Sequence, residues 1–83
     1  MKTHEEKVAE FALELSPVAP VPCGLEVGDV VTFTNEAGLR FGGYKVIGFK
    51  KEIDPDWRPH AFVYLDWANW WFPTSPETLT KEA

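Results

Sequence analysis

The residue types that carry out catalysis are few and widely separated in this sequence. Cys23 is the single cysteine, and His4 and His60 are the only histidines. A nucleophilic cysteine needs a nearby base that helps to form the thiolate, and neither histidine lies in a known catalytic motif. A zinc site needs about four ligands at characteristic spacing, which one cysteine and two distant histidines do not supply. The sequence therefore predicts a protein that is not an enzyme and holds no metal or other cofactor.

The aromatic residues are the strongest functional signal, because four tryptophans are many for 83 residues. Aromatic side chains are enriched in the hot spots of protein interfaces, and large exposed apolar patches mark interaction sites. We expect an aromatic surface that binds a protein or a peptide, with part of it forming an exposed groove lined by Trp57, Tyr64 and Trp70. The full set of predicted binding residues is Trp57, Tyr64, Trp67, Trp70 and Trp71.

Adjacent Trp70 and Trp71 constrain how such a surface is covered. If residues 70–72 form a strand, these two side chains point to opposite faces of the sheet. A sheet of this size cannot bury both faces within itself. One tryptophan should therefore face solvent, an N-terminal helix or a partner, and the sequence leaves these alternatives open.

A second hypothesis rests on cations that lie among aromatic residues. Stacking aromatics beside phosphate-binding cations are the working parts of surfaces that bind single-stranded nucleic acid. The net charge of −5 opposes this reading, because phosphate contacts favour a basic protein surface. Binding of nucleic acid is therefore the alternative to binding of protein. The cations concerned are Arg40, Lys45, Lys50, Lys51 and Arg58.

Acidic charge is concentrated in the N-terminal third of the chain. Residues 1–29 carry six carboxylates and two lysines, which gives a net charge of −4. Residues 30–66 carry equal numbers of acids and bases. The predicted β region is thus close to neutral, and the segment before it is acidic.

A helix is expected near the N-terminus. Thr3 and Glu6 have the spacing of a capping box, in which each side chain accepts a backbone N–H at the helix start. Val8, Phe11 and Leu15 lie on one helical stripe together with Ala12, as in an amphipathic helix. We predict a helix over residues 4–15, within an N-terminal segment of residues 1–16.

A proline-rich connector, residues 17–26, follows this helix. Pro17, Pro20 and Pro22 favour an extended, polyproline-like chain. The same stretch contains a P-x-x-P sequence, and aromatic grooves can receive such peptides. Docking of the connector onto its own domain or onto a second copy, which would give a homodimer, is therefore among the possible interactions.

Residues 27–83 are predicted to form a small β domain. Alternation and composition indicate strands over residues 29–34, 39–51, 61–65 and 70–72. Gly42 and Gly43 interrupt the second strand and indicate a bulge or bend, as Gly48 can further along. A short turn over residues 75–79 should close the domain, with the last four residues frayed.

Four or five short strands with a bent second strand resemble the Src-homology-3-like (SH3-like) small barrels over residues 25–79. The residues Val27-Gly28-Asp29-Val30-Val31 are similar to the usual start of the first strand in these barrels. The resemblance implies a fold and no particular activity, because such barrels have many functions. The expected fold class is mainly β, an α+β small domain built as a partly open antiparallel barrel with one N-terminal amphipathic helix.

The expected location is the cytoplasm. A single cysteine suits a reducing compartment, and the first residues lack the basic and apolar regions of a signal peptide. No apolar run approaches the roughly 18 residues that a membrane span requires, so no membrane partner is expected.

Overall fold

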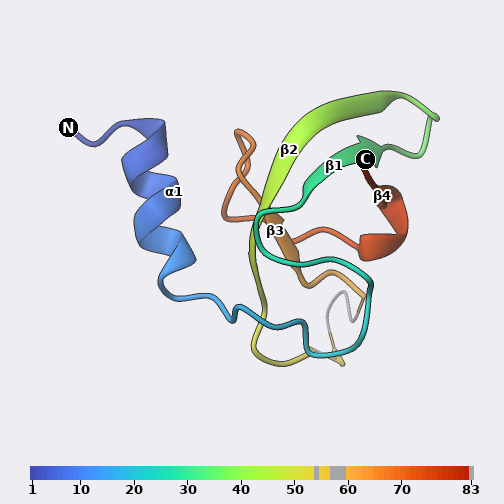
Figure 1. Cartoon of the computed structure of the whole chain (residues 1–83), viewed down its shortest axis with the longest axis horizontal. Coiled ribbons are helices and arrows are strands. Elements are labelled where there is room, and N and C mark those ends of the chain that lie inside the picture. Colours follow the sequence, from blue (N-terminus) through green and yellow to red (C-terminus); the bar gives the residue numbers. More distant parts are fainter. Residues whose placement is uncertain (54, 57–59, 83) are drawn as a thin grey trace.

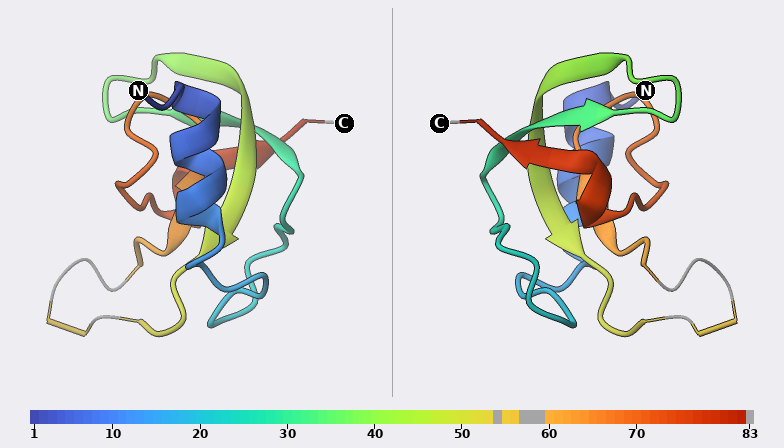
Figure 2. Two further views of the ribbon diagram at one scale, coloured as in Figure 1. Left: turned by 90° about the vertical axis from the view of Figure 1, so that its left-hand side faces the viewer. Right: turned by 90° about the vertical axis from the view of Figure 1, so that its right-hand side faces the viewer.

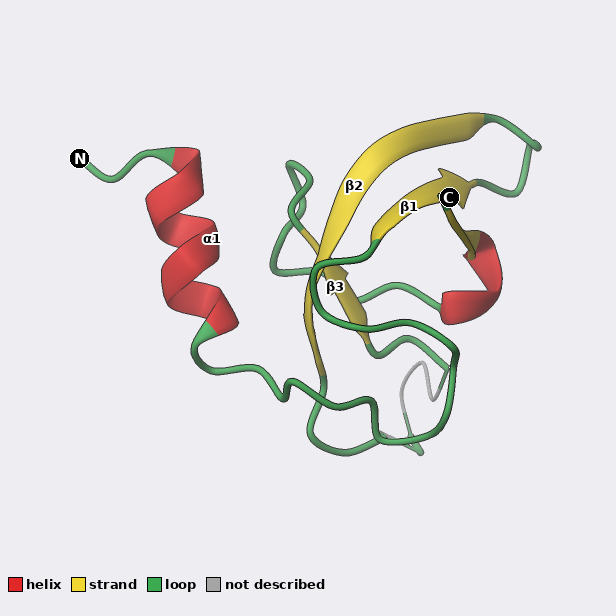
Figure 3. Ribbon diagram, viewed as in Figure 1, coloured by secondary structure: helices red, strands yellow, loops and turns green. Residues whose placement is uncertain are grey.

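The computed structural model describes residues 1–53, 55–56 and 60–82. One α-helix is followed by four strands, which form a single antiparallel sheet in the order β3-β2-β1-β4 (Figures 1 and 3). A short 3-10 helix precedes the last strand. The elements are α1 (His4–Ala12), β1 (Val30–Thr34), β2 (Arg40–Phe49), β3 (Val63–Leu65), the 3-10 helix (Pro76–Thr78) and β4 (Leu79–Lys81).

The hairpin of β1 and β2 contains the bulge that the glycine pair predicts. The pairing slips by one residue between Val31 and Phe33, opposite the glycines. Gly43 has φ +80°, a backbone conformation that favours glycine, and its N–H donates to Glu82 Oε2 at 2.8 Å. The extra residue brings Phe41 and Tyr44 to the same face of β2, because they pair with Phe33 and Val31.

A second bulge lies further along β2, where this strand pairs with β3. The pairing with β3 slips between Val46 and Gly48, so Val46 pairs with Leu65 while Gly48 pairs with Tyr64. The inner face of the sheet thereby holds the core and the outer face meets the helix. The core cluster comprises Val31, Val46, Phe49, Phe62, Val63, Leu65 and Leu79.

Helix α1 lies across the outer face of the sheet, in front of β2 (Figure 2). The Thr3 half of the predicted capping box is confirmed, because Glu6 N–H donates to Thr3 Oγ1 at 3.2 Å. The Glu6 carboxylate accepts the Thr3 hydroxyl, at 3.3 Å, in place of the predicted backbone N–H. The helix ends at Ala12, three residues earlier than predicted. The reason is that Ser16 exchanges two 2.9 Å backbone hydrogen bonds with Phe49, which requires an extended chain there.

Two further expectations about strands were wrong. Residues 70–72 are not a strand but the end of a turn, in which Phe72 N–H donates to the carbonyl oxygen of Asn69 at 2.9 Å. Residues 80 and 81, which belong to the four residues expected to fray, are instead paired, because β4 pairs residues 79–81 with residues 31–33. The result is a small compact domain with one helix and an open four-stranded antiparallel sheet.

Candidate functional site

An outer aromatic cluster joins α1 to the sheet and to the turn after β3. The ring of Phe11 lies 5.2 Å from Tyr64 and 5.1 Å from Trp70, measured between centroids. Trp70 in turn contacts Trp71 at 5.4 Å, with the two rings nearly perpendicular. We call Phe11, Tyr64, Trp70 and Trp71 the outer aromatic cluster.

The inner end of this cluster is closed. Tyr64 is only 7% exposed because Phe11 covers its ring, so it does not line an exposed groove as the sequence suggested. The sequence left open whether the N-terminal helix covers the second aromatic face or whether this face stays exposed. At the Tyr64 end, α1 covers it. Burial also raises the pKa of Tyr64 above its ordinary value of 10.0, since the ionised phenolate would lose its hydration.

The raised pKa of Tyr64 predicts a loss of stability at high pH. The unfolded chain releases the phenolic proton near pH 10.0, whereas the folded chain holds it to a higher pH. This contribution to stability is therefore complete below that pH and is lost as the pH rises through the folded-state pKa. Urea unfolding from pH 8 to about 11 should show Tyr64→Phe losing less stability than the parent chain. An equal loss in both would contradict the assignment.

The outer end of the cluster is open. Trp71 is 55% exposed and its neighbour Phe72 is 38% exposed, whereas Trp70 is half-buried against Phe11. The turn that carries them is held at both ends, by hydrogen bonds of Asp66 with Lys45 and of Thr74 with Val63. The rings of Trp71 and Phe72 are therefore held at the surface by a turn whose two ends are anchored by hydrogen bonds.

Trp67 belongs to a different, inner aromatic cluster. Its ring meets the rings of Phe33 and Tyr44 edge-on, at 5.2 and 5.5 Å, and Phe33 also stacks on Phe41. Trp67 packs against the core, and its enclosed Nε1 has no hydrogen-bond partner among the described residues. The structure therefore separates it from Trp70 and Trp71. The predicted binding residue Trp57 lies outside the described residues.

The cations of the nucleic-acid hypothesis are spread along β2. Arg40 is the first residue of this strand and Lys50 and Lys51 follow its end, so up to roughly 30 Å of strand separates them. Exposed Lys45 lies between, beside acidic Glu5 and Asp66. Arg58 lies outside the described residues. The described cations do not form one basic patch.

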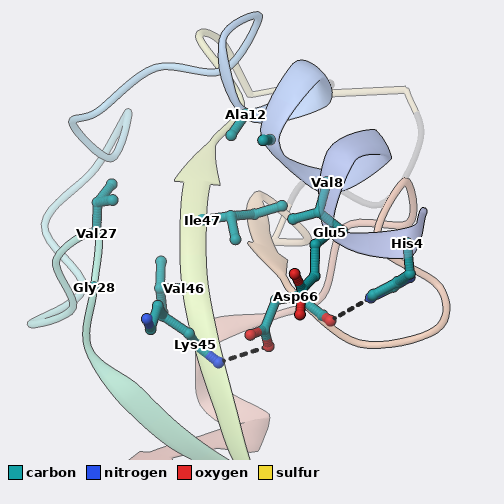
Figure 4. Close-up of a pocket in the computed structure, with 11 residues that line it drawn as sticks. His4, Glu5, Val8, Ala12, Val27, Gly28, Lys45, Val46, Ile47 and Asp66 are labelled. Carbon is teal, nitrogen blue, oxygen red and sulfur yellow. Dashed lines mark hydrogen bonds between the residues drawn. The ribbon is translucent and has the colours of Figure 1, made fainter. Parts of the chain in front are cut away.

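A groove of about 470 Å³ runs between α1 and the sheet (Figure 4). Trp70 lines a different hollow, on the side of α1 that carries Lys7 and Phe11. Its walls are mainly apolar, and its polar end contains His4, Glu5, Lys45 and Asp66. His4 Nε2 donates to the carbonyl oxygen of Asp66 at 3.0 Å, and Asp66 Oδ1 accepts the backbone N–H of Lys45 at 2.8 Å. The apolar lining is Val8, Ala9, Ala12, Val27, Val46 and Ile47.

The candidates for chemistry remain apart in the structure. Cys23 is half-buried and packs against the core, and His4 is engaged with Asp66. Within residues 1–53, 55–56 and 60–82, no three His, Cys, Asp or Glu side chains gather as metal ligands would. None of the described helices has the length and hydropathy needed to cross a membrane.

Two features of the site were missing from the sequence prediction. Phe72 is exposed beside Trp71, and its position before Pro73 in the same aromatic run is the signal that could have included it. The groove beside α1 had no local signal, because its walls come from segments that are distant in the chain. Comparison with known proteins assigns no relative: no protein-family description, no curated protein and no solved structure matches this chain.

Proposed function

We propose that this domain is a non-enzymatic interaction module, which binds a protein or peptide segment through the open end of the outer aromatic cluster. The binding residues are Trp71, Trp70 and Phe72. The observation that carries the proposal is the 55% exposure of Trp71 in a turn whose two ends are hydrogen-bonded to strands. Exposing an indole is costly in water, and a rigid aromatic anchor loses little conformational freedom when it binds.

The surroundings of Trp71 support binding more than a purely structural role. Phe11 packs on both Tyr64 and Trp70, so these contacts join α1 to the sheet without Trp71. Trp71 contacts the edge of this packing and leaves more than half of its own surface to solvent. Aromatic anchors surrounded by such supporting contacts are typical of interface hot spots.

We further propose that the fold is an open relative of the SH3-like barrels. Strands β1, β2 and β3 follow one another as an antiparallel meander, and the 3-10 helix then returns the chain so that β4 pairs with the other side of β1. Bulges interrupt β2 near Gly43 and Gly48, and bulges of this kind allow a short sheet to curl toward closure. A cytoplasmic location, suggested by the lone Cys23, is part of the same proposal.

Selection of peptides from a random library on the immobilised full chain tests this function. Trp71→Ala should lower the affinity for the selected peptides by about tenfold or more, since it removes the aromatic anchor. The free energy of unfolding of the Trp71→Ala variant should differ from that of the parent chain by less than about 1 kcal/mol, because the side chain is exposed. Leu39→Ala is the matched control, because Leu39 is a similarly exposed apolar residue (59%) of the β1–β2 turn and is not one of the proposed binding residues.

The same assay separates the alternatives. Peptides that bind Trp71→Ala as tightly as the parent chain would contradict the proposal. Binding of single-stranded DNA that falls steeply between about 50 and 200 mM salt would instead favour the nucleic-acid alternative. A concentration-dependent mass that Trp71→Ala abolishes would identify a second copy of the chain as the partner.

A further inference from the structure

We propose that the groove between α1 and the sheet is a second interaction surface, and that it receives a basic amphipathic helix from a partner protein. This surface lies on the other side of α1 from the open end of the outer aromatic cluster. The proposal does not depend on the function proposed for that cluster. We call it the α1–β2 groove, and its lining is that shown in Figure 4.

The shape of the groove suits a helix. Helix α1 covers only part of the outer sheet face, and the sheet beside it remains open (Figure 2). On the sheet side Val27 is 47% exposed and Ile47 is half-buried. On the helix side Ala9 and Ala12 line the groove with short side chains, so a neighbouring backbone can approach closely. A helix laid alongside α1 would cover these apolar residues together.

Leu13 extends this apolar surface at the end of α1. Ala9, Ala12 and Leu13 have the spacing i, i+3 and i+4, which places them on one side of the helix. Leu13 is 87% exposed and follows Ala12 directly. Val30 is a further exposed apolar residue, and it pairs with Lys45 on the adjoining strand. The apolar surface is therefore larger than the groove alone.

The charges around the groove specify a basic partner. Glu5 and Asp66 both line it, and neither carboxylate forms an ion pair within the described part of the chain. Asp66 uses Oδ1 for the Lys45 backbone, which leaves Oδ2 available to accept a further donor. Lys45 is the one cation among the described residues of the lining, so the carboxylates are in excess.

The same charges argue against a second copy of α1 as the occupant. This helix carries Glu5, Glu6 and Glu10 against Lys7, and Lys2 already pairs with Glu10. Two such helices side by side would place like charges together, which is unfavourable. An apolar stripe bordered by arginine or lysine would instead match both the alanines and the carboxylates.

A pair of synthetic peptides tests this proposal on the full-length chain. Both peptides are capped and about 14 residues long, roughly four helical turns, with leucines at i, i+3, i+4 and i+7. Arginines border the leucine stripe in one peptide and glutamates in the other. The arginine peptide should bind about tenfold more tightly than the glutamate peptide. Its binding should shift the ¹⁵N–¹H signals of Ala9, Ala12 and Ile47.

Substitutions in the groove locate the binding. Ala9 is exposed, so Ala9→Arg keeps the helix while it fills the groove with a cation, and affinity for the arginine peptide should fall about tenfold or more. Ala37→Arg adds the same charge in the exposed β1–β2 turn and should leave affinity within about twofold. Glu5→Gln should weaken binding about two- to fivefold.

Three outcomes would overturn the proposal. The first is equal binding of the two peptides, which would remove the charge argument. The second is a set of shifts confined to Trp70 and Trp71, which would place the peptide on the other surface. The third is self-association of the chain that Ala9→Arg abolishes, which would identify a second copy as the occupant. Trp71→Ala should not affect the arginine peptide, so failures of the two proposals are distinguishable.

Discussion

Replacing Phe49 by alanine is expected to lower the free energy of unfolding by about 3–5 kcal/mol. Phe49 is 1% exposed and is among the largest fully buried side chains of the core. Its removal loses apolar burial and leaves a cavity, because Val63 and the rest of the cluster are fixed by the sheet. Domains of this size have a total stability of about 5–15 kcal/mol, so the variant should be near the limit of folding.

Phe41→Ala is the matched control for this prediction, because it makes the same change on the same strand. Phe41 is 44% exposed, so its loss should cost far less than the loss of Phe49. Urea unfolding followed by circular dichroism measures both. Similar losses for the two variants would show that the core is not centred at the end of β2 that carries Phe49.

Gly48→Ala is expected to destabilise the domain by about 1–3 kcal/mol through overpacking. A Cβ atom at this position would lie 2.6 Å from Leu15 Cβ and 2.8 Å from Leu15 Cδ1. The clash reaches the base of the leucine side chain, so a change of rotamer does not relieve it. The segment that joins α1 to the sheet would have to move, and Tyr64 should then become more accessible.

A double-mutant cycle isolates this contact. In a Leu15→Gly background the added methyl group at Gly48 loses its three nearest contacts, all of them atoms of Leu15, so its cost should fall by about 1 kcal/mol or more. Gly42→Ala provides the control, because a Cβ there meets nothing closer than Thr32 Oγ1, at 3.2 Å. Equal costs of Gly48→Ala in both backgrounds would contradict the packing of Leu15, in the segment after α1, against Gly48.

The features that sequence predicted correctly are those with local causes. The cap at Thr3 depends on Glu6 three residues away, and the bulge at Gly43 depends on a backbone conformation that few other residues adopt. The buried strand followed from an apolar run whose members are buried on both faces of the sheet, since α1 covers one and the core the other.

The features that it missed depend on long-range pairing. Residues 70–72 have the aromatic composition of a strand, but Asp66 bonds to Lys45 and ends β3. Pairing resumes only at Thr74, after Pro73, which lacks the N–H that a central position would need. Strand β4 is short and polar, and it forms because β1 has a free edge. The alternation argument for Trp70 and Trp71 required a strand. It left open whether one of them faces solvent, the helix or a partner, and in the structure Trp71 is the exposed one.

The candidate site was predictable as a set of residue types and not as an arrangement. Aromatic composition identified Trp70 and Trp71, whereas burial of Tyr64 depends on where α1 packs, 53 residues earlier at Phe11. Trp67 sits on the opposite face because β3 alternates and Trp67 follows Leu65 at the core side. The groove beside α1 arises from the same packing and could not be inferred before it.

The central claim is that α1 closes the outer aromatic cluster at Tyr64 and leaves it open at Trp71. Hydroxyl-radical footprinting of the full-length chain, read by mass spectrometry, tests this claim directly because oxidation follows solvent access. We expect rapid oxidation of Trp71 and protection of Tyr64, with Trp70 intermediate. Oxidation of Tyr64 that keeps pace with Trp71 would show that the helix does not cover this face, and protection of Trp71 would show that the proposed binding surface is closed.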